Sequence, residues 1–193
     1  MHTLVLGLLL FLGLHLVPAA PTLRGRLIGS LGPRAYKLAY SALAVIGIVL
    51  IVHGYREAHW LGRDNVELWT APQSLRHLTL LLMLPALILL AAAYIPSRIR
   101  TYVKHPMLAA IFIWGLAHLL MRGDVASVML FGGFLAYALV DRLSVTKRVA
   151  SGPLGAAQGG PRGDVAAILV GGAAYTTMLL WAHGGIIGAP LLR

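Results

Sequence analysis

Long apolar runs separated by short polar segments recur through nearly the whole chain. A helix needs roughly 20 apolar residues to cross the hydrocarbon core of a membrane, and these runs are close to that length. They lack the alternation of polar and apolar residues that is typical of barrel strands. In lipid their backbone N–H and C=O groups must therefore be hydrogen-bonded within helices. The pattern predicts an all-α integral membrane helix bundle with about six transmembrane helices, over residues 3–19, 37–54, 77–96, 106–121, 124–141 and 165–187.

The segments between these spans predict how the chain is organised. The fourth and fifth spans are joined by the tight turn Arg122-Gly123-Asp124, which indicates an antiparallel hairpin. Residues 144–164 are rich in Gly, Pro and small residues, so we expect a flexible cytoplasmic linker there. We therefore interpret residues 1–143 as a five-helix membrane domain and residues 165–193 as a C-terminal transmembrane helix.

The distribution of basic residues predicts the orientation. Of the 16 Lys and Arg residues, most lie in the loops after the first, third and fifth spans. By the positive-inside rule these loops face the cytoplasm, so both termini are expected to be periplasmic or extracellular. The first span could instead be a cleaved signal peptide, but no Lys or Arg precedes it. A nucleic-acid partner is not indicated, because the basic residues form short clusters rather than one polar face.

Composition narrows the chemistry further. The chain is 59% hydrophobic and 11% charged, with a mean hydropathy of +0.81, which is outside the range of ordinary soluble domains. It has no cysteine, so disulfides, thiolate nucleophiles, Cys-ligated metals and covalently attached haem are excluded. No H-E-x-x-H, Walker A, G-x-S-x-G or dinucleotide-binding fingerprint occurs, so the sequence does not support a hydrolase or a nucleotide-driven pump.

Histidines are the polar residues that stand out within the spans. His15 and His118 have apolar neighbours, and a polar side chain inside a membrane needs a partner. His53, His77 and His105 lie at span ends and are lesser candidates. Neutral imidazole binds haem iron, and two imidazoles from different helices can hold a non-covalent haem. Zinc and di-iron centres are less favoured, because the carboxylates are few and lie at span ends.

The depth of each histidine limits which of them can share an iron. His105 and His118 are 13 positions apart, or about 20 Å along a helix, so they cannot form one site. The predicted topology places His15 near the cytoplasmic end of its span and His118 near the outer end. Pairs at one depth are therefore open alternatives: two of His53, His77 and His118 on the outer side, or His15 with His105 on the inner side.

Five segments of the chain carry motifs that resemble the NnrU family of bacterial membrane proteins. They are LGLHLVPAAPTLRGRL (12–27), RAYKLAYSALAVIGIVLIVHGY (34–55), ELW (67–69), SLRHLTLLLMLPALILLAAAY (74–94) and RTYVKHPMLAAIFIWGLAHLLMRGDVASVMLFGGFLAYALVDR (100–142). The resemblance covers roughly residues 1–145. It implies a protein of the bacterial inner membrane that is associated with denitrification, in particular with nitrite and nitric oxide reduction.

This family is similar to the plant and cyanobacterial 15-cis-ζ-carotene isomerases, which bind haem b. Their pattern has one histidine late in the first shared helix and another in a C-L-A-H segment after an R-H-P motif. The resemblance puts these axial ligands at His15 and His118, although Lys104 replaces the arginine and Gly115 the cysteine. Haem iron binds nitric oxide readily, so a haem in this bundle would account for the association with denitrification.

Three functions remain open from the sequence. The first is an NnrU-like membrane protein that binds haem b and acts in nitrogen-oxide metabolism. The second is a carotene cis-trans isomerase, in which Phe112, Trp114 and Tyr137 line an apolar channel for the substrate. The third is a non-enzymatic assembly factor of a membrane reductase. The expected partners are the lipid bilayer and either an apolar substrate or such a reductase.

Overall fold

Helices make up nearly all of the described structure, and no strand is found among the described residues. The computed structural model describes residues 1–60, 65–147, 159–187 and 191. The helices are α1 His2–Leu16, α2 Pro21–Leu31, α3 Pro33–Trp60, α4 Leu75–Ala92, α5 Arg98–Val103, α6 Pro106–Leu119, α7 Val125–Lys147, α8 Pro161–Thr177 and α9 His183–Ile187. The prediction of an all-α membrane helix bundle is confirmed.

Five segments of the described chain are long and apolar enough to cross a membrane. They are His2–Ala19, Pro33–Trp60, Leu75–Ala92, Val125–Val145 and Pro161–Gly185. The span expected at residues 106–121 corresponds to α6, which has 14 residues and rises only about 21 Å. The hydrocarbon core is about 30 Å thick, so α6 is shorter than a full crossing. The six expected spans thus become five long apolar segments and one short helix.

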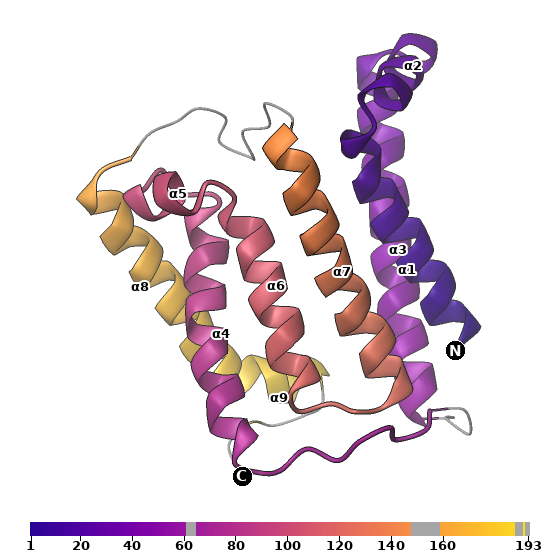
Figure 1. Ribbon diagram of the computed structural model, residues 1–193. Helices are drawn as coiled ribbons and strands as arrows, with labels where there is room; N and C mark the ends of the chain where they lie inside the picture. Colours follow the sequence, from indigo (N-terminus) through magenta and orange to yellow (C-terminus); the bar gives the residue numbers. More distant parts are fainter. Residues whose placement is uncertain (61–64, 148–158, 188–190, 192–193) are drawn as a thin grey trace.

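The long helices contact one another in the order α8, α4, α6, α7, α1 and α3. Figure 1 shows them side by side, with α6 and α7 forming the antiparallel hairpin that the tight turn predicted. The start of α1 and helix α9 lie at one end of the bundle, whereas α2 and α5 lie at the other end. The basic segments around α2 and α5 therefore lie at one end of the bundle. The start of α1 and helix α9 lie at the opposite end.

The segment between the first two spans is a helix, although the sequence suggested a loop. Pro21 begins α2, as the fixed φ of proline favours at the first helical position. Gly32 ends it with a φ of 78°, in the left-handed region that glycine adopts without strain. Pro33 then begins α3, which is 28 residues long and runs well past the expected end of the second span.

The last long helix is attached to the rest of the bundle. Helix α7 runs to Lys147 and α8 begins at Pro161, so both described ends of the expected linker are helical; residues 148–158 are outside the described part. The Asp164 carboxylate accepts hydrogen bonds from Arg98 Nε at 2.6 Å and from the Ile99 backbone N–H at 3.0 Å. These contacts fix the start of α8 against α5, and α8 packs against α4.

Helices α1 and α3 cross with their backbones in contact, because glycines stand at the crossing. A Cβ atom on Gly7 would lie 2.6 Å from the Ile51 backbone nitrogen, and one on Gly54 would overlap the Leu4 backbone. Small residues permit such close approach in lipid, where packing rather than the hydrophobic effect holds helices together. Leu4, Leu8, Ile51 and Phe131 are buried beside this crossing, in a cluster shared by α1, α3 and α7.

The crossing gives a matched test of helix packing. We expect Gly7→Ala to destabilise the detergent-solubilised protein by about 1–3 kcal/mol, because the methyl group meets backbone that cannot move aside. Gly13→Ala is the control on the same helix, where nothing lies within 4 Å of an added Cβ. The better helix propensity of alanine should leave Gly13→Ala as stable as the parent or more so. Equal thermal midpoints for the two variants would contradict the close α1–α3 contact.

Candidate functional site

His118 lies in the last turn of α6 with one ring nitrogen already committed. Its Nδ1 is 2.8 Å from the carbonyl oxygen of Trp114, one turn earlier, so Nδ1–H donates to that oxygen. A histidine held in this way presents Nε2 with its lone pair, which is the nitrogen a metal would take. The imidazole stacks on Phe131 of α7 at 4.4 Å between ring centroids and contacts the Trp114 ring at 5.2 Å.

His15 has the same local geometry at the end of α1. Its Nδ1 is 2.7 Å from the carbonyl oxygen of Phe11, which again leaves Nε2 as the available nitrogen. The ring is 4.1 Å from the Phe11 ring, 5.6 Å from Tyr40 on α3 and 6.3 Å from Tyr137 on α7. The imidazole therefore lies among aromatic rings from three helices.

The structure does not bring His15 and His118 onto one iron. Their neighbours on α7, Tyr137 and Phe131, are six residues apart, which is about 9 Å along the helix. Two axial nitrogens on one iron are only about 4 Å apart, twice a metal–imidazole bond. Three rings stand between the two imidazoles in consecutive contact: Phe11 to Phe134 at 5.7 Å, and Phe134 to Trp114 at 5.5 Å.

The lesser candidates lie elsewhere. His53 is exposed on α3, and His77 is exposed in the first turn of α4. His105 is the N-cap of α6, and Pro106 follows as the first helical residue, as the sequence indicated. His183 is the first residue of α9. Donor chemistry thus fits a haem iron at His118 and at His15 separately, whereas the described geometry does not fit one iron held by both.

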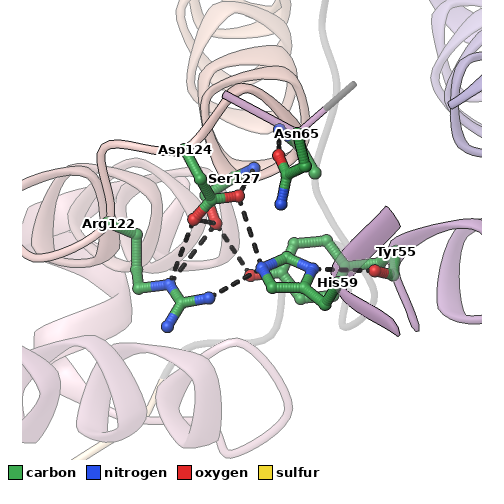
Figure 2. A network of polar contacts seen from close by, with 7 residues as sticks. Tyr55, His59, Asn65, Arg122, Asp124 and Ser127 are labelled. Carbon is green, nitrogen blue, oxygen red and sulfur yellow. Dashed lines mark hydrogen bonds and ion pairs between the residues drawn. The ribbon is translucent and has the colours of Figure 1, made fainter. Parts of the chain in front are cut away.

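A polar cluster at the end of the bundle was not expected from the sequence. We name it the Asp124 cluster; it comprises Tyr55, His59, Asn65, Arg122, Asp124 and Ser127 (Figure 2). Asp124 precedes α7, and its carboxylate accepts hydrogen bonds from the Ser127 backbone N–H at 3.0 Å and the Ser127 hydroxyl at 2.7 Å. It thereby caps the helix, as aspartate does before many helices. Arg122 Nε lies 3.4 Å from the same carboxylate.

His59 and Arg122 complete the Asp124 cluster. His59 Nδ1 is 2.8 Å from the Tyr55 carbonyl oxygen, so Nε2 carries a lone pair in the neutral ring. Arg122 Nη2 donates to His59 Nε2 at 2.7 Å, and that nitrogen is 3.3 Å from Asp124 Oδ1. Figure 2 shows His59 and Arg122 side by side, each reaching Asp124 and in contact with the other.

Loop backbone holds the cluster together. The Leu68 N–H donates to the Gly123 carbonyl at 2.8 Å, and the Val125 N–H donates to the Val66 carbonyl at 3.0 Å. These two bonds pair the loop before α4 with the α6–α7 turn. They position Asn65, whose Oδ1 accepts the Ala126 N–H at 2.9 Å. The turn itself was visible in the sequence, but its pairing with a loop more than 50 residues away was not.

A cavity of about 170 Å³ opens beside this cluster, lined by His59, Asn65, Glu67, Met121, Arg122 and Asp124. This volume has room for several water molecules, and the polar lining offers them partners. Among the described residues, no three His, Asp or Glu side chains are placed to hold a metal ion. The cavity is a polar recess whose lining carries both signs of charge.

The cluster and His118 are neighbours through two aromatic side chains. The Tyr55 hydroxyl lies 2.8 Å from the Ser127 hydroxyl, and its ring is 6.3 Å from the Phe131 ring, edge to face. Phe131 in turn stacks on His118. His118, half-buried at the end of α6, thus lies next to a charged recess at the end of the bundle, whereas His15 lies towards the basic end.

The environment of Asp124 sets its protonation. Burial by itself would raise the pKa of the carboxyl group, but the hydrogen bonds from Ser127, the charge of Arg122 and a contact with Asn65 outweigh it. The pKa of Asp124 is consequently lower than its ordinary value. Asp124 is ionised at neutral pH, and its negative charge offsets the positive charge of Arg122.

Comparison with known proteins adds one match. The family model described as NnrU protein matches residues 3–191, which is nearly the whole chain. The match includes the last long helix and the segment before it, although the recognisable sequence motifs end near residue 145. Neither the curated proteins nor the solved structures contain a match.

The depressed pKa of Asp124 predicts how stability depends on pH. The folded state holds this carboxylate ionised more strongly than the unfolded chain does, so its contribution is complete above the unfolded pKa of about 3.9. The contribution is lost as the pH falls through the lower folded pKa. We expect Asp124→Asn to lower the thermal midpoint at pH 7 and to reduce its further fall between about pH 5 and pH 3.

Glu67→Gln is the control, because it makes the same chemical change in the same cavity on an exposed side chain. Its midpoint should follow that of the parent protein at every pH. A parent protein and an Asp124→Asn variant with equal midpoints at pH 7 would rule out a stabilising role for this carboxylate.

Proposed function

The chain belongs to the NnrU family, and we propose that it is a haem b-binding membrane protein of nitrogen-oxide metabolism in which His118 is an axial ligand. The observation that carries this proposal is the hydrogen bond from His118 Nδ1 to the Trp114 carbonyl oxygen. That bond fixes the tautomer and the direction of Nε2, which is the usual preparation of a metal-ligating histidine. Bound ferrous haem would supply an iron that takes nitric oxide as a ligand.

The residues around His118 suit one face of such a group. Phe131 and Trp114 lie against the imidazole and offer apolar surface to a porphyrin edge. His15 is the second ligand proposed by the resemblance, and it has the same prepared Nε2. For both nitrogens to share one iron, the Phe11, Phe134 and Trp114 rings between them would have to move. The proposal therefore depends on His118 as the ligand and does not require His15 to bind the same iron.

We infer the inner membrane of a bacterium as the location, with both termini on the outer side. The support is the apolar length of the described helices and the gathering of basic residues at the end with α2 and α5. Positive charge of this kind is retained on the cytoplasmic side during insertion. The Asp124 cluster would then face the periplasm, where soluble nitrogen oxides reach the membrane surface.

Haem content is the direct test. Protein purified from haem-supplied cells should show a Soret band, and a pyridine extract should identify haem b. His118→Ala should lower the bound haem by roughly tenfold or more, because the ligand is removed from an otherwise intact apolar site. His53→Ala and His77→Ala are the controls, since both side chains are exposed and should retain the full Soret band.

His15→Ala separates one-ligand from two-ligand binding. If His15 also ligates the iron, the alanine variant changes the ferric spectrum from a six-coordinate low-spin form; if it does not, the spectrum is unchanged. A colourless parent protein would overturn the haem proposal. Copurification of a membrane reductase with that colourless protein would instead favour the accessory role.

Carotene cis-trans isomerisation is a second candidate, favoured by one observation. Two of the three aromatic residues expected to line a channel contact the candidate ligands, because Trp114 touches His118 and Tyr137 touches His15. Together with the rings between the two histidines, they form a continuous row of aromatic side chains, and apolar aromatic surface of this kind lines sites for apolar ligands.

Expression in cells that accumulate tri-cis-ζ-carotene tests this candidate. If the protein is an isomerase, the 15-cis bond is converted to trans and a new isomer is seen by chromatography. The His118→Ala variant should lose this conversion. Trp114→Leu should slow the conversion, because it keeps an apolar side chain but removes the ring that contacts both Phe134 and His118. An unchanged isomer composition with folded parent protein would remove the isomerase candidate.

A further inference from the structure

Helix α2 and the first two turns of α3 carry a basic patch without local compensation. Its members are Arg24, Arg26, Arg34 and Lys37, all exposed. No Asp or Glu precedes Glu57 in the sequence. None of these four side chains takes part in an ion pair with another described residue. Four positive charges are therefore gathered on one short segment and face solvent or lipid headgroups.

The position of α2 keeps this patch at the membrane surface. The helix follows one apolar span, α1, and precedes another, α3, so it cannot move far from the bilayer. It has no buried residue and packs only on α3 and on the 3-10 turn Val17–Ala19, as far as the described contacts show. Figure 1 shows it beyond the upper ends of the α1–α3 pair.

The sequence of α2 matches a helix that lies in the membrane interface. Leu23, Leu27 and Leu31 recur every four positions and so share one side of the helix. Leu23 and Leu31 are 47% and 51% exposed, which leaves apolar surface for the acyl boundary. Arg24 and Arg26 fall on either side of this stripe, where arginines lay their stems on apolar surface and keep the guanidinium among polar groups.

We propose that α2 lies in the headgroup region of the bilayer and that Arg24, Arg26, Arg34 and Lys37 bind anionic phospholipid headgroups. This goes beyond a role in orienting the spans, because it assigns a selective lipid contact in the finished protein. The phosphate of a lipid is favoured over soluble phosphate because the exposed leucines next to the charges need an apolar neighbour. The three guanidinium groups of this patch can each bind phosphate oxygens in a bidentate way.

Native mass spectrometry of the full-length protein tests the proposal. Detergent-solubilised protein is given equimolar phosphatidylglycerol and phosphatidylcholine, and the bound lipids are counted. The parent protein should retain phosphatidylglycerol over phosphatidylcholine by roughly fivefold or more, since each surface cation near anionic lipid contributes about a fivefold factor. The variant Arg24→Gln/Arg26→Gln/Arg34→Gln/Lys37→Gln should bind the two lipids equally.

The charge-conserving variant Arg24→Lys/Arg26→Lys is the matched control and should keep most of the preference. The preference of the parent protein for phosphatidylglycerol should weaken progressively as the salt concentration is raised. This measurement does not depend on the folding of any variant. Inorganic phosphate at 10-fold excess over lipid should not displace phosphatidylglycerol. Equal binding of both lipids by the parent protein, a preference retained in the four-glutamine variant, or displacement by inorganic phosphate would each overturn the proposal.

Discussion

The close backbone contact between helices is the constraint on which this structure depends. In lipid the apolar side chains gain nothing by meeting one another, so helices associate where small residues let their surfaces fit. Gly7 and Gly54 do this between α1 and α3, and Gly171 does it between α8 and α4, where a Cβ would lie 2.5 Å from the Ile88 Cα. These contacts set the order of the helices and with it the neighbours of every polar group.

The lipid environment also determines where polar side chains lie and what they contact. His15 and His118 each donate from one ring nitrogen to the carbonyl oxygen four residues earlier, so that nitrogen needs no water as a partner. Charged groups gather where the chain leaves the apolar region. The Asp124 cluster forms at the α6–α7 turn, where the Asp124 carboxylate offsets the positive charge of Arg122 and Arg122 donates to the His59 imidazole.

This arrangement gives His15 and His118 different environments, although the resemblance to the carotene isomerases puts both of them on one haem iron. His118 lies beside the Asp124 cluster through Phe131 and Tyr55, whereas His15 lies among Tyr40 and Tyr137. The depth difference expected from span positions is thus present in the structure. In the proposed function, an iron held by His118 would lie next to this charged recess, through which a small polar reactant would approach the apolar bundle.

The sequence alone determined the helical membrane class, the approximate positions of the spans, the α6–α7 hairpin and the two histidines that most need partners, since these depend on local apolar length and spacing. It did not reveal α2 or the Asp124 cluster. Helix α2 has only 11 residues, and its leucines at every fourth position are too few to distinguish it from a loop in the sequence; its bounds come from Pro21 and Gly32. The cluster joins Tyr55, Asn65 and Asp124, which only tertiary structure decides, because no local signal encodes hydrogen bonds between residues so distant in the chain.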